Sequence, residues 1–157
     1  MGFADPGGVA EGFRAAWNRA SAEELTAVFT TDADFVNVVG FWWRGHRQIR
    51  HNHAIGFRDM FPDTTMVFEK TRIRMLGEGH AVVHARWRVD GQRVPDASAT
   101  SRAGTRRGVF TFVVSRFGED DWLAVAAHNT DIIPGAQTHL TGDDGTLRPV
   151  RYQAQPD

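Results

Sequence analysis

The sequence contains no cysteine among its 157 residues. This absence excludes disulfide frameworks, thiolate zinc sites and cysteine nucleophiles. Lys70 is the only lysine and Tyr152 the only tyrosine. The formal net charge is −1 at pH 7, so the chain has no basic excess that would favour nucleic acid or an anionic membrane as a partner.

Long apolar runs and known cofactor motifs are also missing. No apolar stretch approaches the roughly 20 residues of a membrane span, and residues 1–6 have neither a basic nor an apolar signal region. The sequence contains no phosphate-binding or dinucleotide-binding glycine loop and no Gly-x-Ser-x-Gly elbow. We therefore expect a soluble, cytoplasmic protein without a bound cofactor.

The remaining composition is ordinary for one globular domain, with 41% hydrophobic and 24% charged residues. A chain of this length buries roughly two thirds of its unfolded surface and folds without disulfides or metals. We expect a single domain over residues 1–133, followed over 134–157 by a polar tail without periodicity.

Hydrophobic periodicity predicts helices first and strands afterwards. An apolar stripe of period 3.6 marks the first helix, and Ser21 with Glu24 forms a capping box before the second. Beyond Pro62 the period changes to two, which is typical of strands. The predicted helices cover 7–20, 22–29 and 46–60, and the predicted strands cover 34–44, 66–76, 80–90, 107–118 and 122–133.

This order of elements predicts an α+β fold, in which a curved, mostly antiparallel sheet wraps over three N-terminal helices as a cone with an apolar interior. Such interiors commonly hold a small molecule. Residues 109–114 are apolar on both faces of their strand apart from Thr111. Both faces therefore need cover, one by helices and the other by a second copy of the chain in a homodimer.

Several segments resemble the nuclear-transport-factor-2-like superfamily, whose fold is also called cystatin-like. They are Phe29–Gly40, Arg44–His46, Ile49, His53 and Trp122–Thr130. The spacing from Gly45 to His53 and the terminal His-Asn-Thr are similar to the SnoaL-like group, and within it to the SgcJ/EcaC family found among bacterial natural-product genes. The resemblance covers residues 8–133 and implies a conical fold, a homodimer and a ligand pocket between helices and sheet.

Ketosteroid isomerases are the best-understood relatives in that superfamily. In this sequence the position of their catalytic aspartate falls on Asn37, and the position of their oxyanion-hole tyrosine falls on Phe13. Their second aspartate has no counterpart, because no carboxylate lies between Asp96 and Glu119. The resemblance therefore implies that the chain shares the fold of these isomerases but lacks their catalytic residues.

Two polar residues are candidates for catalysis on the helices and the first strand. His53 lies on the apolar stripe of its helix, where a neutral imidazole could be a general acid or base. The alternative is a core histidine bonded to a backbone carbonyl. Asn37 stands in an apolar strand and could orient a ligand carbonyl or pair with His53.

The last strand offers three further candidates. His128 and Asn129 are neighbours, so their side chains face opposite ways and only one can enter the pocket. Both faces are apolar and leave the choice open, although related association domains favour Asn129 for ligand binding. Asp131 shares the face of Asn129 and is the best-placed carboxylate for acid/base catalysis, with a surface role as the alternative.

Large aromatic side chains are candidates for the pocket wall. We expect Phe13, Trp17, Trp43 and Trp87 to line it, the alternative being ordinary core packing. Trp42 and Trp43 are neighbours and face opposite ways, so one of the pair could lie at an interface.

The remaining histidines and a group of arginines complete the candidates. His80 and His84 share a strand face but lie about 13 Å apart, too far to share one ion, so no metal site is expected. Arg102, Arg106 and Arg107 cluster beside a loop and could meet an acidic ligand, although a solvated basic patch is the alternative.

These observations predict a SnoaL-like enzyme or accessory protein acting on an apolar or aromatic, polyketide-like metabolite. Its chemistry would be cofactor-free acid/base or positional catalysis, and not ketosteroid isomerisation. The alternative is a non-catalytic module for small-molecule binding or dimerisation.

Overall fold

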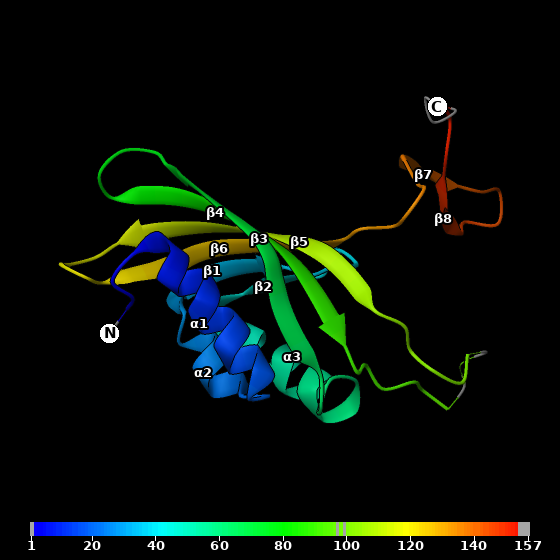
Figure 1. Cartoon of the computed structure of the whole chain (residues 1–157), viewed down its shortest axis with the longest axis horizontal. Coiled ribbons are helices and arrows are strands. Elements are labelled where there is room, and N and C mark those ends of the chain that lie inside the picture. Colours follow the sequence, from blue (N-terminus) through cyan, green and yellow to red (C-terminus); the bar gives the residue numbers. More distant parts are fainter. Residues whose placement is uncertain (1, 97, 99, 154–157) are drawn as a thin grey trace.

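The computed structural model describes residues 2–96, 98 and 100–153. In this part of the chain, three helices lie on one side of a six-stranded sheet, and a separate two-stranded sheet follows (Figure 1). The elements are α1 (Pro6–Asn18), α2 (Ala22–Thr26), β1 (Phe29–Val36), β2 (Trp42–Arg44), α3 (Gly45–Asp59), β3 (Thr65–Met75), β4 (His80–Asp90), β5 (Arg106–Arg116), β6 (Trp122–Asp131), β7 (Thr138–Thr141) and β8 (Leu147–Val150).

The larger sheet has the strand order β2-β1-β6-β5-β4-β3. Every neighbouring pair is antiparallel except β1 and β6, which run parallel. The sheet curves around α1, α2 and α3, and the space between them forms the interior of a cone (Figure 1). The predicted α+β class and conical arrangement are confirmed.

The helices follow from local sequence signals. The Asp5 side chain caps α1 by accepting a hydrogen bond from the Gly8 backbone N–H at 2.9 Å, and Pro6 occupies the first helical turn. Ser21 caps α2 by accepting from the Glu24 N–H at 3.2 Å. No helix in the described residues is long and apolar enough to cross a membrane.

The core is centred on Phe13 of α1, which is completely buried. Its ring packs edge-on against Phe110 and Phe112 of β5, at centroid distances of 4.8 and 5.4 Å. It also stacks on Phe35 of β1 at 6.3 Å. One aromatic cluster therefore joins α1 to two strands that are far apart in the sequence.

The boundary between α2 and β1 differs from the prediction. The second helix ends at Thr26 instead of residue 29, and the first strand begins at Phe29 instead of residue 34. The apolar pair Val28 and Phe29 fits the inward face of either element, so periodicity alone assigned it to the helix.

The predicted strand over 34–44 is interrupted by a turn, because the Asn37 side chain bonds the turn backbone. Its Oδ1 accepts hydrogen bonds from the N–H groups of Val39 and Phe41, at 3.1 and 2.9 Å. Gly40 within this turn has φ +89°, in the left-handed region that favours glycine. The strand is therefore divided into β1 and β2.

The C-terminal segment contains a hairpin, which the polar, aperiodic sequence of residues 134–157 did not predict. Strands β7 and β8 pair with each other in antiparallel register, from Thr138 with Val150 to Thr141 with Leu147. Gly145 in the connecting turn has φ +74°. The hairpin projects away from the cone (Figure 1). The proposed boundary of the conical domain near residue 133 remains a prediction.

Candidate functional site

A cavity of about 120 Å³ lies inside the cone, between the helices and the concave face of the sheet. Its wall is mostly aromatic, and its polar side chains come from α3, from the end of β1, and from β5 and β6. The aromatic wall consists of Trp17, Phe35, Trp43, Phe57, Phe61, Trp87 and Phe110, and the polar lining consists of Asn37, Asn52, His53, Arg106 and Asn129.

His53 of α3 lines the cavity and has one ring nitrogen fixed by a hydrogen bond and one without a partner among the described residues. Its Nδ1 lies 2.8 Å from the Ile49 carbonyl oxygen, which only accepts hydrogen bonds, so Nδ1 carries the proton and donates. In a neutral imidazole, Nε2 is then an unprotonated acceptor. No described residue hydrogen-bonds Nε2, and the side chain lines the cavity.

The surroundings keep this imidazole neutral. Burial lowers the pKa of His53 to about 4 from its ordinary value of 6.5, and the hydrogen bond to Ile49 opposes only part of that effect. The rings of Phe35 and Trp43 meet the imidazole edge-on at 4.9 and 5.3 Å and contribute to the burial. At neutral pH His53 is therefore an acceptor and a weak base.

Asn37 directly follows β1 and is part of the cavity lining. Its oxygen already accepts from the backbone N–H groups of Val39 and Phe41, which can only donate. The Nδ2 group is therefore the part of the side chain that remains available as a donor. Asn37 does not pair with His53, which was one of the two alternatives from the sequence.

Asn129 of β6 enters the cavity, and its neighbour His128 does not. The Trp87 indole Nε1–H donates to Asn129 Oδ1 at 2.7 Å, so Asn129 also retains Nδ2 as its available donor. His128 lies on the opposite face of the sheet, in a surface hollow with Val36 and Trp42. Of the two alternatives that the sequence left open, Asn129 lines the cavity, and strand alternation turns its neighbour His128 outward.

Asp131 forms an ion pair with Arg106, a residue of β5 that lines the cavity. The contact is bidentate, with Arg106 Nε 3.0 Å from Oδ1 and Nη2 2.9 Å from Oδ2. The guanidinium also lies 5.9 Å from the centre of the Trp87 ring. Asp131 itself is not part of the lining, so the predicted catalytic carboxylate balances the charge of Arg106 instead.

Asn52 of α3 was not among the predicted site residues, and its amide has the reverse orientation. Its Nδ2 donates to the Gln48 carbonyl at 2.8 Å, which leaves Oδ1 as the available acceptor. The side chain lines the cavity beside His53.

The other large aromatic residues lie in three different places, which are the cavity wall, the core and the surface. Trp17, Trp43 and Trp87 line the cavity, whereas Phe13 is completely buried behind the wall and does not line it. The Trp17 Nε1–H donates to Thr64 Oγ1 at 2.9 Å, which fixes that ring. Trp42 is exposed on the other face, where its Nε1–H donates to Asp34 at 2.7 Å.

Arg106 was noted from the sequence only as one of a basic cluster. Strand alternation could have placed it, because Arg106 has the same parity as the buried residues Phe110 and Phe112. Asn52 had a weaker signal, since it adjoins His53 at the edge of the apolar stripe.

The arrangement can bind and orient an uncharged ring. Its walls are apolar, its one charged lining residue is paired with Asp131, and its amide groups are fixed by hydrogen bonds. No group of three His, Asp or Glu side chains in the described residues could hold a metal ion.

Comparisons with known proteins agree with this geometry. The profile of the SnoaL-like domain family matches residues 10–121. Among curated protein sequences, none matches this chain.

Several solved structures share the fold. A cystatin-like protein of uncharacterised function from Caulobacter vibrioides is 25% identical, with a TM-score of 0.70 over 80% of this chain and 86% of that chain. An NTF2-like superfamily protein from Salmonella enterica is 17% identical, with a TM-score of 0.65 over 80% of this chain and 87% of that one. A proposed scytalone dehydratase from Novosphingobium aromaticivorans is 15% identical, with a TM-score of 0.65 over 93% and 85%.

Proposed function

The chain belongs to the SnoaL-like domain family, and on that premise we propose that it binds one small, mostly apolar metabolite inside its cone. The observation that carries the proposal is the aromatic cavity, into which polar side chains converge from α3 and from the sheet. A concave, largely apolar site with a few fixed polar groups is the usual form of a small-molecule site.

The size of the cavity supports a ligand with a single ring. Pockets for drug-sized ligands measure roughly 300–1,000 Å³, whereas an apolar cavity of roughly 150 Å³ admits benzene. The cavity here measures about 120 Å³, slightly less than that benzene cavity and well below the drug-sized range. The proposed metabolite is therefore a monocyclic, polyketide-like compound and not a fused polycyclic one, and ketosteroid isomerisation is not proposed.

Binding without chemistry is the simpler form of the proposal. The pKa of His53, lowered to about 4 by burial, makes it a weak base at neutral pH. Asp131 is bonded to Arg106 through both oxygens. Within the described residues, no carboxylate lines the cavity.

A second candidate is cofactor-free catalysis, favoured by one observation. His53 Nε2 and the Asn129 amide come from different layers of the fold and line the same cavity. A base facing a carbonyl-binding donor suits proton removal next to a carbonyl. One fold neighbour is by its name a dehydratase of scytalone, which supports a small-molecule reaction as an alternative. Membership of the SgcJ/EcaC family within natural-product metabolism is part of this second candidate.

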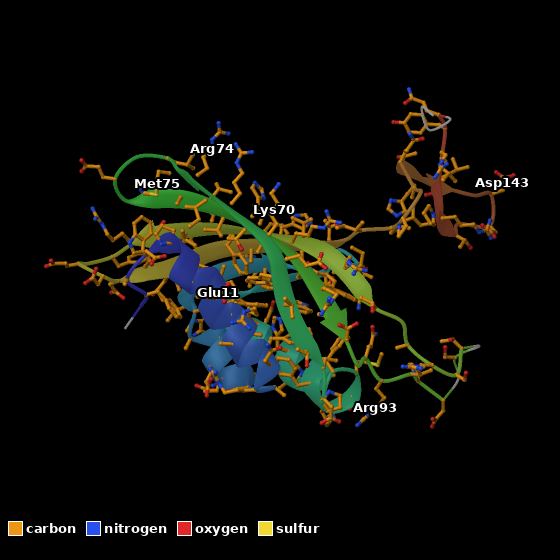
Figure 2. All side chains as sticks on the ribbon, viewed as in Figure 1. Glu11, Lys70, Arg74, Met75, Arg93 and Asp143 are labelled. Atoms are coloured by element: carbon orange, nitrogen blue, oxygen red, sulfur yellow. The ribbon has the colours of Figure 1, made fainter. Side chains whose placement is uncertain are left out.

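We also propose that the protein is a cytoplasmic homodimer, in which the two copies meet through the outer face of the sheet. The half of that face over β2, β1, β6 and β5 has apolar side chains such as Val36, Val113 and Trp42. The half over β3 and β4 is basic, and Figure 2 shows Lys70 and Arg74 extending from β3 away from the helices. A two-fold contact over the basic half would oppose like charges, so the apolar half is the proposed interface. Light scattering at micromolar concentration tests this, since a monomer would overturn it.

The binding proposal is tested by filling the cavity at Gly56 of α3. A Cβ at Gly56 would meet Phe61 at 3.7 Å, an ordinary contact, so Gly56→Ala fits the fold and stabilises the helix by roughly 0.5–1 kcal/mol. Gly56→Leu places a larger apolar side chain into the same cavity.

The measurement is quenching of tryptophan fluorescence during titration with benzaldehyde, phenol and acetophenone. Three of the five tryptophans line the cavity, so an occupant changes their emission. We expect saturable binding to the wild type and Gly56→Ala, and none to Gly56→Leu. Equal binding to all three proteins, or binding to none of them, would contradict the proposal.

A further inference from the structure

Among the described residues, the polar groups of the lining without a hydrogen-bond partner include Nδ2 donors on the sheet side and two acceptors on α3. On the sheet side, Asn37 and Asn129 retain their Nδ2 groups, because their oxygens accept from backbone N–H groups and from the Trp87 indole. These partners can only donate, so hydrogen bonding fixes both amide orientations.

The helix side has the opposite character. His53 Nδ1 and Asn52 Nδ2 both donate to backbone carbonyls of the preceding helical turn, those of Ile49 and Gln48. A carbonyl oxygen cannot donate, so His53 Nε2 and Asn52 Oδ1 remain as acceptors. Two layers of the fold therefore present complementary hydrogen-bonding groups to one small space.

The cavity as a whole is electrically neutral. Arg106 is its one charged lining residue in the described part of the chain, and the bidentate contact with Asp131 balances that charge. An anionic ligand would enter an apolar space without a free countercharge, which is costly. A neutral acceptor such as a carbonyl oxygen incurs no such penalty.

From this division we infer that the ligand is a neutral single ring with a carbonyl group directed to Asn37 and Asn129 and a hydroxyl group directed to α3, where His53 Nε2 accepts its proton in a hydrogen bond. The inference rests on the proposed binding function and names the ligand class of the same cavity. A hydroxylated aromatic aldehyde or ketone has this pattern.

The probe compound is 4-hydroxybenzaldehyde, compared with three compounds that each lack one feature. Benzaldehyde lacks the hydroxyl, phenol lacks the carbonyl, and 4-hydroxybenzoate replaces the carbonyl by an anion. Each additional neutral hydrogen bond strengthens binding by about three- to tenfold. We expect 4-hydroxybenzaldehyde to bind most tightly by that factor over benzaldehyde and phenol, and 4-hydroxybenzoate to bind most weakly.

Two substitutions test which side recognises which group. His53→Phe keeps an aromatic side chain but removes the acceptor, so the three- to tenfold preference for 4-hydroxybenzaldehyde over benzaldehyde should disappear while benzaldehyde still binds. Asn129→Asp can still accept from Trp87 but loses the Nδ2 donor, so the preference for 4-hydroxybenzaldehyde over phenol should fall, because only the Asn37 donor remains for the carbonyl.

Matched controls lie on the outer face of the sheet. His84→Phe changes an exposed histidine of β4, and Thr130→Asp adds the same charge as Asn129→Asp to the exposed neighbour on β6. Both controls should keep both preferences.

The outcomes separate this inference from the binding proposal. If none of the four compounds binds, both fail. If the compounds bind to the wild type without the expected preferences, or if His53→Phe and Asn129→Asp keep them, the binding function stands and the inferred orientation is overturned.

Discussion

The two faces of the same sheet differ in almost every physical respect. On the inner face, Trp87, Phe110 and Phe112 are buried against the helices. On the outer face of the same strands, Arg86 and His84 are exposed. Alternation along a strand separates these two environments by a single residue, as Asn129 and His128 demonstrate.

The difference shows where polar groups have a fixed geometry. Inside, each amide is oriented by a partner that can only donate or only accept, such as the Trp87 indole. Outside, charges pair loosely in solvent, for example Arg86 with Glu69 at 3.7 Å. Exposed pairs of this kind contribute little to stability. The inner face therefore holds its polar groups in a fixed geometry, whereas the ion pairs of the outer face are exposed to solvent.

The largest expected contrast between the faces concerns stability. Phe13→Ala removes the side chain at the centre of the aromatic cluster and should lower the free energy of unfolding by about 3–5 kcal/mol. Val67→Ala on the exposed side of β3 should cost less than about 1 kcal/mol. Urea denaturation measures both, and similar losses would remove the distinction between the faces.

The next contrast concerns the pH dependence of the free energy of unfolding, to which a buried and an exposed histidine contribute differently. The folded-state pKa of His53 lies near 4 and its ordinary value is 6.5, so between these values the unfolded state binds the proton and the folded state does not. Stability from this group is complete above pH 6.5 and falls by about 3 kcal/mol as the pH is lowered to 4.

His53→Phe should remove that part of the pH dependence, and the outer-face variant His84→Phe should keep it. The comparison uses urea denaturation at a series of pH values between 4 and 7. A wild type and His53→Phe protein with parallel pH profiles would show that the imidazole is not buried as described.

A smaller effect is expected from the charge balance of the cavity. Asp131→Asn leaves Arg106 without its carboxylate, so the affinity for benzoate should rise about fivefold, the equivalent of about 1 kcal/mol for a partly exposed pair. The control Glu69→Gln makes the same change in net charge on the outer face, beside Arg86 and Arg107. Calorimetric titration should detect no rise for the control, and equal rises would indicate a long-range charge effect only.

The smallest effect is expected from the C-terminal hairpin. Strands β7 and β8 form their own sheet and project from the cone, so a chain that ends at residue 133 should keep its Tm within about 2 °C. Differential scanning calorimetry measures this. An unfolded product would show that the hairpin supports the conical domain.

The sequence predicted most of the fold because its hydrophobic periodicity and its capping and turn residues were strong local signals. The apolar stripe of α1, the capping by Ser21 and the alternation through His80–Asp90 depend on neighbouring residues, which a sequence displays directly. The hairpin of β7 and β8 was missed although Asp144-Gly145 between two short runs is a turn signal.

The site was harder to predict because its decisive contacts are non-local. The ion pair of Arg106 with Asp131 joins residues 25 positions apart, and the bond from Trp87 to Asn129 joins residues 42 positions apart. Both faces of β6 are apolar in sequence, and a register shift between Ala124 and Ala126 changes which residues face inward, so periodicity could not choose between His128 and Asn129. The size of the cavity depends on how the aromatic rings pack, which periodicity does not specify.

The most direct test of the account is a crystal structure of the protein soaked with 4-hydroxybenzaldehyde. The account predicts the ring inside the cone, with its hydroxyl oxygen within hydrogen-bond distance of His53 Nε2 and its carbonyl oxygen beside Asn129 Nδ2. A ring bound on the outer face of the sheet, or inside the cone with these two groups exchanged, would contradict it.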